Sequence, residues 1–269
     1  MNNLTKLKKI LRENEQPKET TVNLEKGAKR VGFLFAPSVV KSLFDNMKDV
    51  TRRPLESKKM EKLNKALQDG LITEDFSAPE NQEIVMAHAP CQIGDLIWVR
   101  ESYKEEGYWE DKGSISKKTG KPKKDWVSNH VAHYDDQGDA PEPKEGMIWR
   151  GKPSMHMPSW ANRLCLHVKD VYIERIQDIS EDQAQREGAY HYFSNRGWSE
   201  EIGGCDSSVK FYFGAAGSKA YDSPREAYMN LWDELYGWKE EYSWGANGWV
   251  WVIEFSLVHN NVDVLLPKE

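Results

Sequence analysis

Residues 31–53, VGFLFAPSVVKSLFDNMKDVTRR, carry the pattern around which the rest of the chain is organised. The segment opens with five residues that form a compact apolar run typical of a β-strand. Pro37 is well suited to the first turn of a helix, and the apolar residues that follow it give that helix a buried face. Asn46 tolerates a left-handed conformation and is expected to end the helix. The sequence therefore predicts a strand, a helix and a turn in succession.

The predicted turn places a lysine amine three residues before a threonine hydroxyl. We expect this spacing to bring Lys48 and Thr51 to one side of the chain. A lysine in partly dry surroundings loses proton affinity and can act as a base toward a neighbouring hydroxyl, as in Ser-Lys acyl-transfer enzymes. Arg52 and Arg53 suit an anionic or flat polar ligand. The same spacing also fits a basic turn on a solvated surface, so the remaining sequence has to separate the two interpretations.

Composition narrows the class of protein. The 269 residues can bury a substantial core, and a net charge of -6 argues against a protein that coats nucleic acid non-specifically, although a local basic cleft is permitted. Three cysteines that lie far apart indicate neither a disulfide framework nor a zinc site, and we expect no metal and no cofactor. With no long apolar run and no signal peptide, we expect a cytoplasmic protein without a membrane partner.

The rest of the chain indicates an α+β protein. Helices are expected at 57–69, 181–187 and from residue 224, the second opening with Ser180 in a capping box and ending at Gly188. Strands are expected at 83–87, 96–100 and 249–255, and one long bent strand or a hairpin at 163–176. Residues 149–158 are expected to be irregular because they contain two prolines.

The expected domain organisation has one domain with two insertions. We expect a flexible or helical arm at residues 1–28, a single domain at 29–260 and a C-terminal tail at 261–269. Residues 104–146 and 190–222 change in character and are predicted to be insertions, the first a long excursion or a hairpin arm, since structureless loops of such length are uncommon inside compact domains. Its lysine cluster at 117–124 fits a solvated loop or an RNA contact. Eleven tryptophans fit core positions or platforms on which bases stack.

Several fragments together resemble the ASCH-domain proteins, which are related to the PUA fold of RNA-binding modules. They are the segment with Lys48 to Arg53, GDLIWVRE at 94–101, IQDIS at 176–180 leading to Glu187, and WVWVIEF at 249–255. The segment from Trp149 to Arg163 is similar to the larger ASCH proteins often carried by bacteriophages. The resemblance implies a PUA-like mixed β-barrel with flanking helices and a cleft beneath its first helix.

One branch of that family consists of N4-acetylcytidine amidohydrolases, which remove acetate from the modified nucleoside. The resemblance implies catalytic roles for Lys48, Thr51 and Glu187. The glycine of the family motif is Asn46 here, and Asp49 adds a negative charge that we expect to keep Lys48 protonated. Residues expected to bind substrate are Arg52, Arg53, Arg100, Tyr103, Trp149 and His156.

Three functions from different classes follow from the resemblance. The first is hydrolysis of an acylated nucleoside, in which Lys48 activates Thr51 and Glu187 handles protons at the leaving amine. The second is a non-catalytic module that binds RNA or modified bases. The third is cleavage of RNA. Each predicts a modified nucleoside or RNA as partner, and the sequence carries no signal for the oligomeric state.

Overall fold

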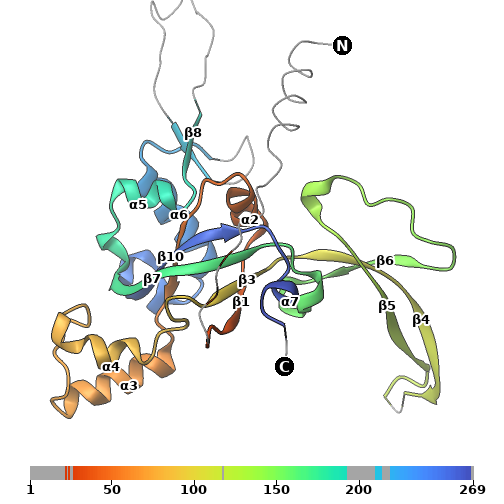
Figure 1. Ribbon diagram of the computed structural model, residues 1–269, viewed down its shortest axis with the longest axis horizontal. Coiled ribbons are helices and arrows are strands. Elements are labelled where there is room, and N and C mark those ends of the chain that lie inside the picture. Colours follow the sequence, from red (N-terminus) through yellow and green to blue (C-terminus); the bar gives the residue numbers. More distant parts are fainter. Residues whose placement is uncertain are drawn as a thin grey trace, which may run out of the picture.

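The computed structural model describes residues 22, 24, 27–116, 118–192, 210–213 and 219–267. Within them the chain forms a mixed α+β structure, as the sequence predicts (Figure 1). Most of the predicted N-terminal arm and much of the second insertion lie outside the described residues. The helices are α2 (Pro37–Phe44), α3 (Ser57–Gln68), α4 (Gln82–Met86), α5 (Glu181–Arg186), α6 (Pro224–Tyr236) and α7 (Val262–Leu265).

Five strands form the main sheet, in the order β1-β3-β7-β10-β2. Strands β1 and β3 are parallel, whereas β7 pairs antiparallel with β3 and β10, and β10 pairs antiparallel with β2. The inner strand β10 is apolar and mostly buried, which accounts for its place between two neighbours. The bounds of the five are β1 Arg30–Leu34, β2 Val50–Pro54, β3 Leu96–Arg100, β7 Cys165–Arg175 and β10 Trp249–Val258.

The main sheet does not close into a barrel among the residues that the structure describes. Strands β1 and β2 are its two edges, and no backbone ladder joins them there. A side chain spans the gap instead, since Arg53 of β2 donates from Nη2 to the backbone oxygen of Leu34 in β1 at 2.9 Å. The edges are therefore close, and the sheet is curved but open.

The organising segment folds as its sequence predicts up to the turn. Helix α2 begins at Pro37, and Leu43 is fully buried against the sheet. Asn46 takes a left-handed conformation with φ of 54°. Thr51 differs from the prediction, because it lies in strand β2 and not in the turn. Pairing with β10, where Thr51 is opposite Ile253, fixes this extended conformation.

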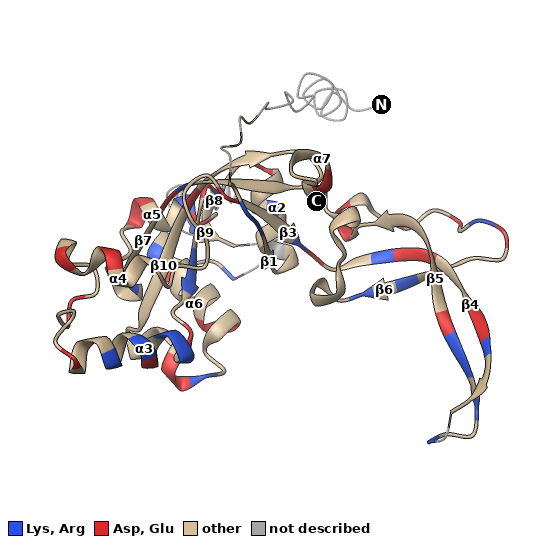
Figure 2. Cartoon of the chain, turned by 60° about the horizontal axis from the view of Figure 1, so that its bottom comes forward, with Lys and Arg blue, Asp and Glu red and all other residues tan. Residues whose placement is uncertain are grey.

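The first predicted insertion forms an arm that extends away from the main sheet (Figures 1 and 2). Its three antiparallel strands have the order β5-β4-β6 and comprise β4 (Tyr103–Ile115), β5 (Pro122–His133) and β6 (Ile148–Lys152). The second predicted insertion contributes a two-stranded ladder of β8 (Tyr190–Tyr192) and β9 (Lys210–Tyr212).

Two of the predicted elements are wrong. Residues 83–87 lie mainly in helix α4 and not in a strand, with Val85 buried. A short apolar run does not distinguish the two, and here the preceding loop, held by hydrogen bonds from Asn81 to Thr73 and Asp75, directs the chain into a helical turn. Residues 148–152 form β6 because β4 offers a partner strand, and the first proline, Pro153, comes only after the strand has ended.

The C-terminal segment packs against the main sheet. In α7, Val262 is fully buried and joins a small apolar cluster with Leu96 and Cys165. Asn261 caps this helix and donates to the backbone oxygens of Ser159, Trp160 and Asn162. These bonds tie the segment to the loop before β7.

Candidate active site

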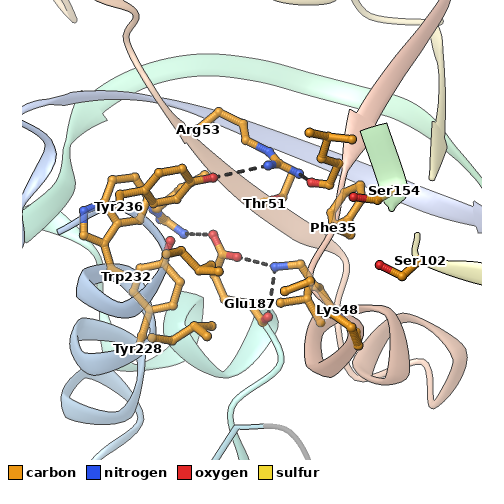
Figure 3. A pocket seen from close by; sticks show the side chains of 17 residues that line it. Phe35, Lys48, Thr51, Arg53, Ser102, Ser154, Glu187, Tyr228, Trp232 and Tyr236 are labelled. Carbon is orange, nitrogen blue, oxygen red and sulfur yellow. Dashed lines mark hydrogen bonds and ion pairs between the residues drawn. The ribbon is translucent and has the colours of Figure 1, made fainter. Parts of the chain in front are cut away.

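A cavity of about 360 Å³ lies where the first helix, strand β2, the end of α5 and helix α6 meet (Figure 3). It contains all three residues with expected catalytic roles and the two neighbouring arginines. Its polar lining residues are Lys48, Thr51, Arg52, Arg53, Ser102, Ser154, Glu187, Tyr228 and Tyr236. Its apolar wall comes mainly from Leu34, Phe35, Ala36, Pro37, Val39, Leu231, Trp232 and Leu235.

Backbone contacts bring the Lys48 turn to the end of α5. The amide of Asp49 donates to the backbone oxygen of Arg186 at 3.1 Å, which links two segments that are far apart in the sequence. Gly188 has φ of 108°, and a Cβ at this position would lie 2.9 Å from the Cβ of Ser42 in α2. Because only glycine accepts both conditions without strain, Gly188 allows Glu187 to approach Lys48.

A buried network of charges forms the polar side of the cavity. The Lys48 amine donates to the side-chain carboxylate of Glu187 and, at 2.9 Å, to its backbone oxygen. Arg52 donates from Nη1 to the other carboxylate oxygen of Glu187 at 3.1 Å and from Nε to Glu174 at 2.7 Å. The side chains of Lys48, Arg52 and Glu187 are at most 3% exposed. Two cations and two carboxylates thus balance each other, and of these four side chains Glu174, which is 15% exposed, is the one in contact with water.

Burial lowers the pKa of Lys48 below its ordinary value of 10.5, although the Glu187 carboxylate acts in the opposite direction. The amine therefore gives up its proton more readily than a lysine in water. Burial also raises the pKa of the Tyr228 phenol well above its ordinary value, and the charge of Glu187 adds to this effect. A phenol that remains protonated is a hydrogen-bond donor on the wall of the cavity.

Thr51 lines the same cavity and is 4% exposed. Its hydroxyl forms no hydrogen bond with any residue that the structure describes, and the Lys48 amine is bonded to Glu187 and not to Thr51. The hydroxyl is thus available to a molecule in the cavity. Transfer of its proton to Lys48 requires the two groups to approach within hydrogen-bond distance, and catalytic hydrogen bonds commonly tighten only when the substrate binds.

Asp49 does not affect Lys48 as the sequence predicts. Its carboxylate accepts from Arg186 Nε at 2.9 Å on the outer surface, and Arg186 also bonds to Glu254. The acid that pairs with Lys48 is Glu187. The backbone alternates side-chain direction at this point, with Lys48 buried and Asp49 exposed.

Arg53 forms the border of the cavity between two aromatic groups. Its guanidinium lies 4.6 Å from the ring centroid of Phe35 and donates to the Tyr236 hydroxyl at 3.2 Å. Tyr236 in turn lies against Trp232, with ring centroids 4.5 Å apart. A flat cation and several rings therefore line the side of the cavity opposite Lys48, and such a wall suits a flat heterocyclic ligand.

Four residues expected to bind substrate do not line this cavity. Arg100 donates to the backbone oxygen of Met155 and lies over the Trp98 ring, and Tyr103 is buried in a cluster with Tyr134 and Met157. Trp149 belongs to β6 and donates to the backbone oxygen of Pro141 at 2.6 Å. His156 is exposed in a short 3-10 turn. Arg100 lies at the end of β3, Tyr103 and Trp149 lie in strands of the arm and His156 lies in a turn after β6, and none of the four lines the cavity that contains Lys48.

The aromatic wall comes instead from α6, a helix in which no site residue was expected. Tyr228, Trp232 and Tyr236 recur every four residues and therefore share one face of the helix. That spacing is the signal by which they could have been found. Trp238 is 74% exposed because the helix has already ended at Tyr236.

A metal-binding cluster and a membrane-spanning helix are both absent from the described part of the chain. It contains no group of three or more metal-ligating side chains and no helix that is both long and apolar enough to span a membrane. Comparison with protein-family models, with curated proteins and with solved structures gives no match.

Proposed function

We propose that this protein is a hydrolase that removes an acyl group from a modified nucleoside, most concretely acetate from N4-acetylcytidine. The observation that carries the proposal is the convergence of Lys48, Thr51 and Glu187 on one cavity. A buried amine with a lowered pKa, a hydroxyl without a partner in the described structure and a carboxylate are the groups that amide hydrolysis needs. The aromatic wall supports a heterocyclic base as the ligand, and the likeness of the chain to ASCH-domain amidohydrolases supports the reaction.

The proposed reaction has two steps. Lys48, as the free amine, takes the proton from Thr51, whose oxygen attacks the acetyl carbonyl; the C–N bond then breaks, and the N4 nitrogen leaves with a proton supplied through the Lys48–Glu187 pair. This produces cytidine and an acetyl ester on Thr51. In the second step water attacks the ester and acetate leaves, so that the Thr51 hydroxyl is restored. The buried pair suits both steps because it can both accept and donate a proton.

The test is incubation of the purified protein with N4-acetylcytidine while the release of cytidine is followed. We expect turnover by the wild-type protein that is lost in both Thr51→Ala and Lys48→Ala. Glu254→Gln is the matched control, because Glu254 lies in a half-exposed ion pair that does not line the cavity. Unchanged turnover in both cavity variants would refute the site.

A second candidate is a module that binds a modified base without changing it. The observation in its favour is that the Lys48 amine is bonded to Glu187 and not to Thr51. In a binding module the buried charges would only shape the cavity and donate to the ligand. Tight binding of N4-acetylcytidine without release of acetate, equally strong in Thr51→Ala, would favour this candidate.

A further inference from the structure

The arm formed by β4, β5 and β6 begins at the edge of the cavity. Ser102, immediately before β4, and Ser154, shortly after β6, both line the cavity wall. The neighbouring Glu101 is 5% exposed and accepts two hydrogen bonds of 2.8 Å from Arg163. This anchored ion pair fixes the base of the arm relative to the cavity.

The outer end of the arm is basic in an otherwise acidic protein. Between residues 112 and 124 the sequence has six lysines and no acidic residue, whereas the chain has a net charge of -6. Lys112 and Lys124 pair across the hairpin with Asp125 and Asp111. Lys118, Lys121 and Lys123 are exposed and have no ion pair with any residue that the structure describes. Figure 2 shows this end of the arm far from the main sheet.

Aromatic rings and a second cationic group lie between the basic end and the cavity. Trp109 of β4 is 43% exposed and meets Trp126 of β5 edge to face, with ring centroids 5.4 Å apart. The Arg150 guanidinium lies 4.6 Å from the Trp109 ring centroid and 5.4 Å from that of Trp126, and it has no ion pair within the described structure. An exposed ring and a partly buried one beside cations that have no ion pair in the described structure are features of surfaces that stack bases and neutralise phosphates.

We propose that the arm binds single-stranded RNA and presents one of its modified nucleosides to the cavity. This inference deepens the proposed function and rests on it for the identity of that nucleoside. Strand β4 has 13 residues and so extends about 40 Å. That length matches roughly 12 nucleotides of a stacked strand at about 3.4 Å each. Single-stranded RNA is the partner that uses both the cations and the exposed rings, because its bases are free to stack on aromatic side chains.

The test is the fluorescence anisotropy of a labelled 12-nucleotide RNA at several salt concentrations. The arm variant is K118Q/K121Q/K123Q, and its matched control is K58Q/K62Q/K65Q, which removes the same charge from exposed positions on α3. We expect the slope of log K against log salt to be shallower by about 2 in the arm variant. Each phosphate contact with a single strand contributes about 0.7 to this slope, and the variant removes three lysines. The control should leave the slope unchanged, and W109L should weaken binding about tenfold or more.

Different results would refute the RNA site on the arm and the hydrolase activity of the cavity. Equal salt slopes in the arm variant and its control, with unchanged thermal unfolding, would overturn the arm as an RNA site. So would lysine-dependent binding to phosphatidylserine vesicles in the absence of RNA binding. Release of acetate from the free nucleoside by wild-type protein tests the cavity alone, so that result stands whether or not the RNA binds.

Discussion

Replacing Glu187 with glutamine tests the buried charge network most strongly. The substitution keeps the shape of the side chain but removes the charge that balances Lys48 and Arg52, both of which are almost fully buried. Breaking a buried ion pair by removing one partner costs about 3–5 kcal/mol. Arg52 retains Glu174, so most of the loss is expected to come from the unpaired Lys48 amine. We therefore expect Glu187→Gln to lower the free energy of unfolding by about 3–5 kcal/mol.

The assay is urea unfolding of four proteins: wild type, Glu187→Gln, Lys48→Met and the double variant. The double variant no longer contains the unpaired amine, so it should be more stable than Glu187→Gln alone, with a coupling free energy of about 2 kcal/mol. Glu254→Gln is the control, since its partner Arg186 is 33% exposed and loss of such a pair costs at most about 1 kcal/mol.

The pH dependence of the stability of Glu187→Gln tests the same network independently. Without Glu187, nothing offsets the burial that lowers the pKa of Lys48. In the window between the lowered folded pKa and 10.5, the unfolded state then binds more protons, so the stability of Glu187→Gln should rise with pH. Three results would together refute the buried charge network: a loss of unfolding free energy below about 1 kcal/mol in Glu187→Gln, additive effects of the two single variants in the double variant, and a stability of Glu187→Gln that does not rise with pH.

Three further predictions follow from the cavity. Gly188→Ala should destabilise the protein by about 1–3 kcal/mol through backbone strain, and the contact with Ser42 adds to this, as thermal unfolding will measure. The rate of acetate release should rise with pH through the lowered pKa of Lys48, because only the free amine accepts the Thr51 proton; a rate that rises nowhere below pH 10.5 would contradict this role. Tyr236→Phe removes the acceptor of Arg53 and should raise KM several-fold with little change in kcat, while stability falls by no more than about 1.5 kcal/mol.

Local signals in the sequence predicted much of the fold. Pro37 begins α2, Asn46 is left-handed, and Ser180 caps α5 with the reciprocal bonds of a capping box. Each of these depends on neighbouring residues only, so the sequence contains the necessary information. Helix α4 was missed because the hydrogen bonds of the loop before it, through Asn81, decide its conformation, and strand β6 was missed because its partner strand β4 is distant in the sequence.

The site residues that could be predicted are those in the segment 31–53 and Glu187, which the family resemblance implied. Lys48, Thr51 and Glu187 do reach one cavity, but the expected effect of Asp49 on Lys48 was wrong, because exposure of Asp49 and burial of Glu187 depend on how α5 packs against the turn. Tyr103 and Trp149 were expected to bind substrate, yet they pack within the arm region. Which aromatic residues face a cavity is set by tertiary contacts, and Trp232 and Tyr236 reach it through the position of α6.

The most direct measurement of the central claim is the mass of the protein quenched during its first turnover of N4-acetylcytidine. The account predicts one added acetyl group, located by peptide mapping on Thr51, and none in Thr51→Ala. Acetate release at the wild-type rate by Thr51→Ala, with no acetylated intermediate in either protein, would contradict it.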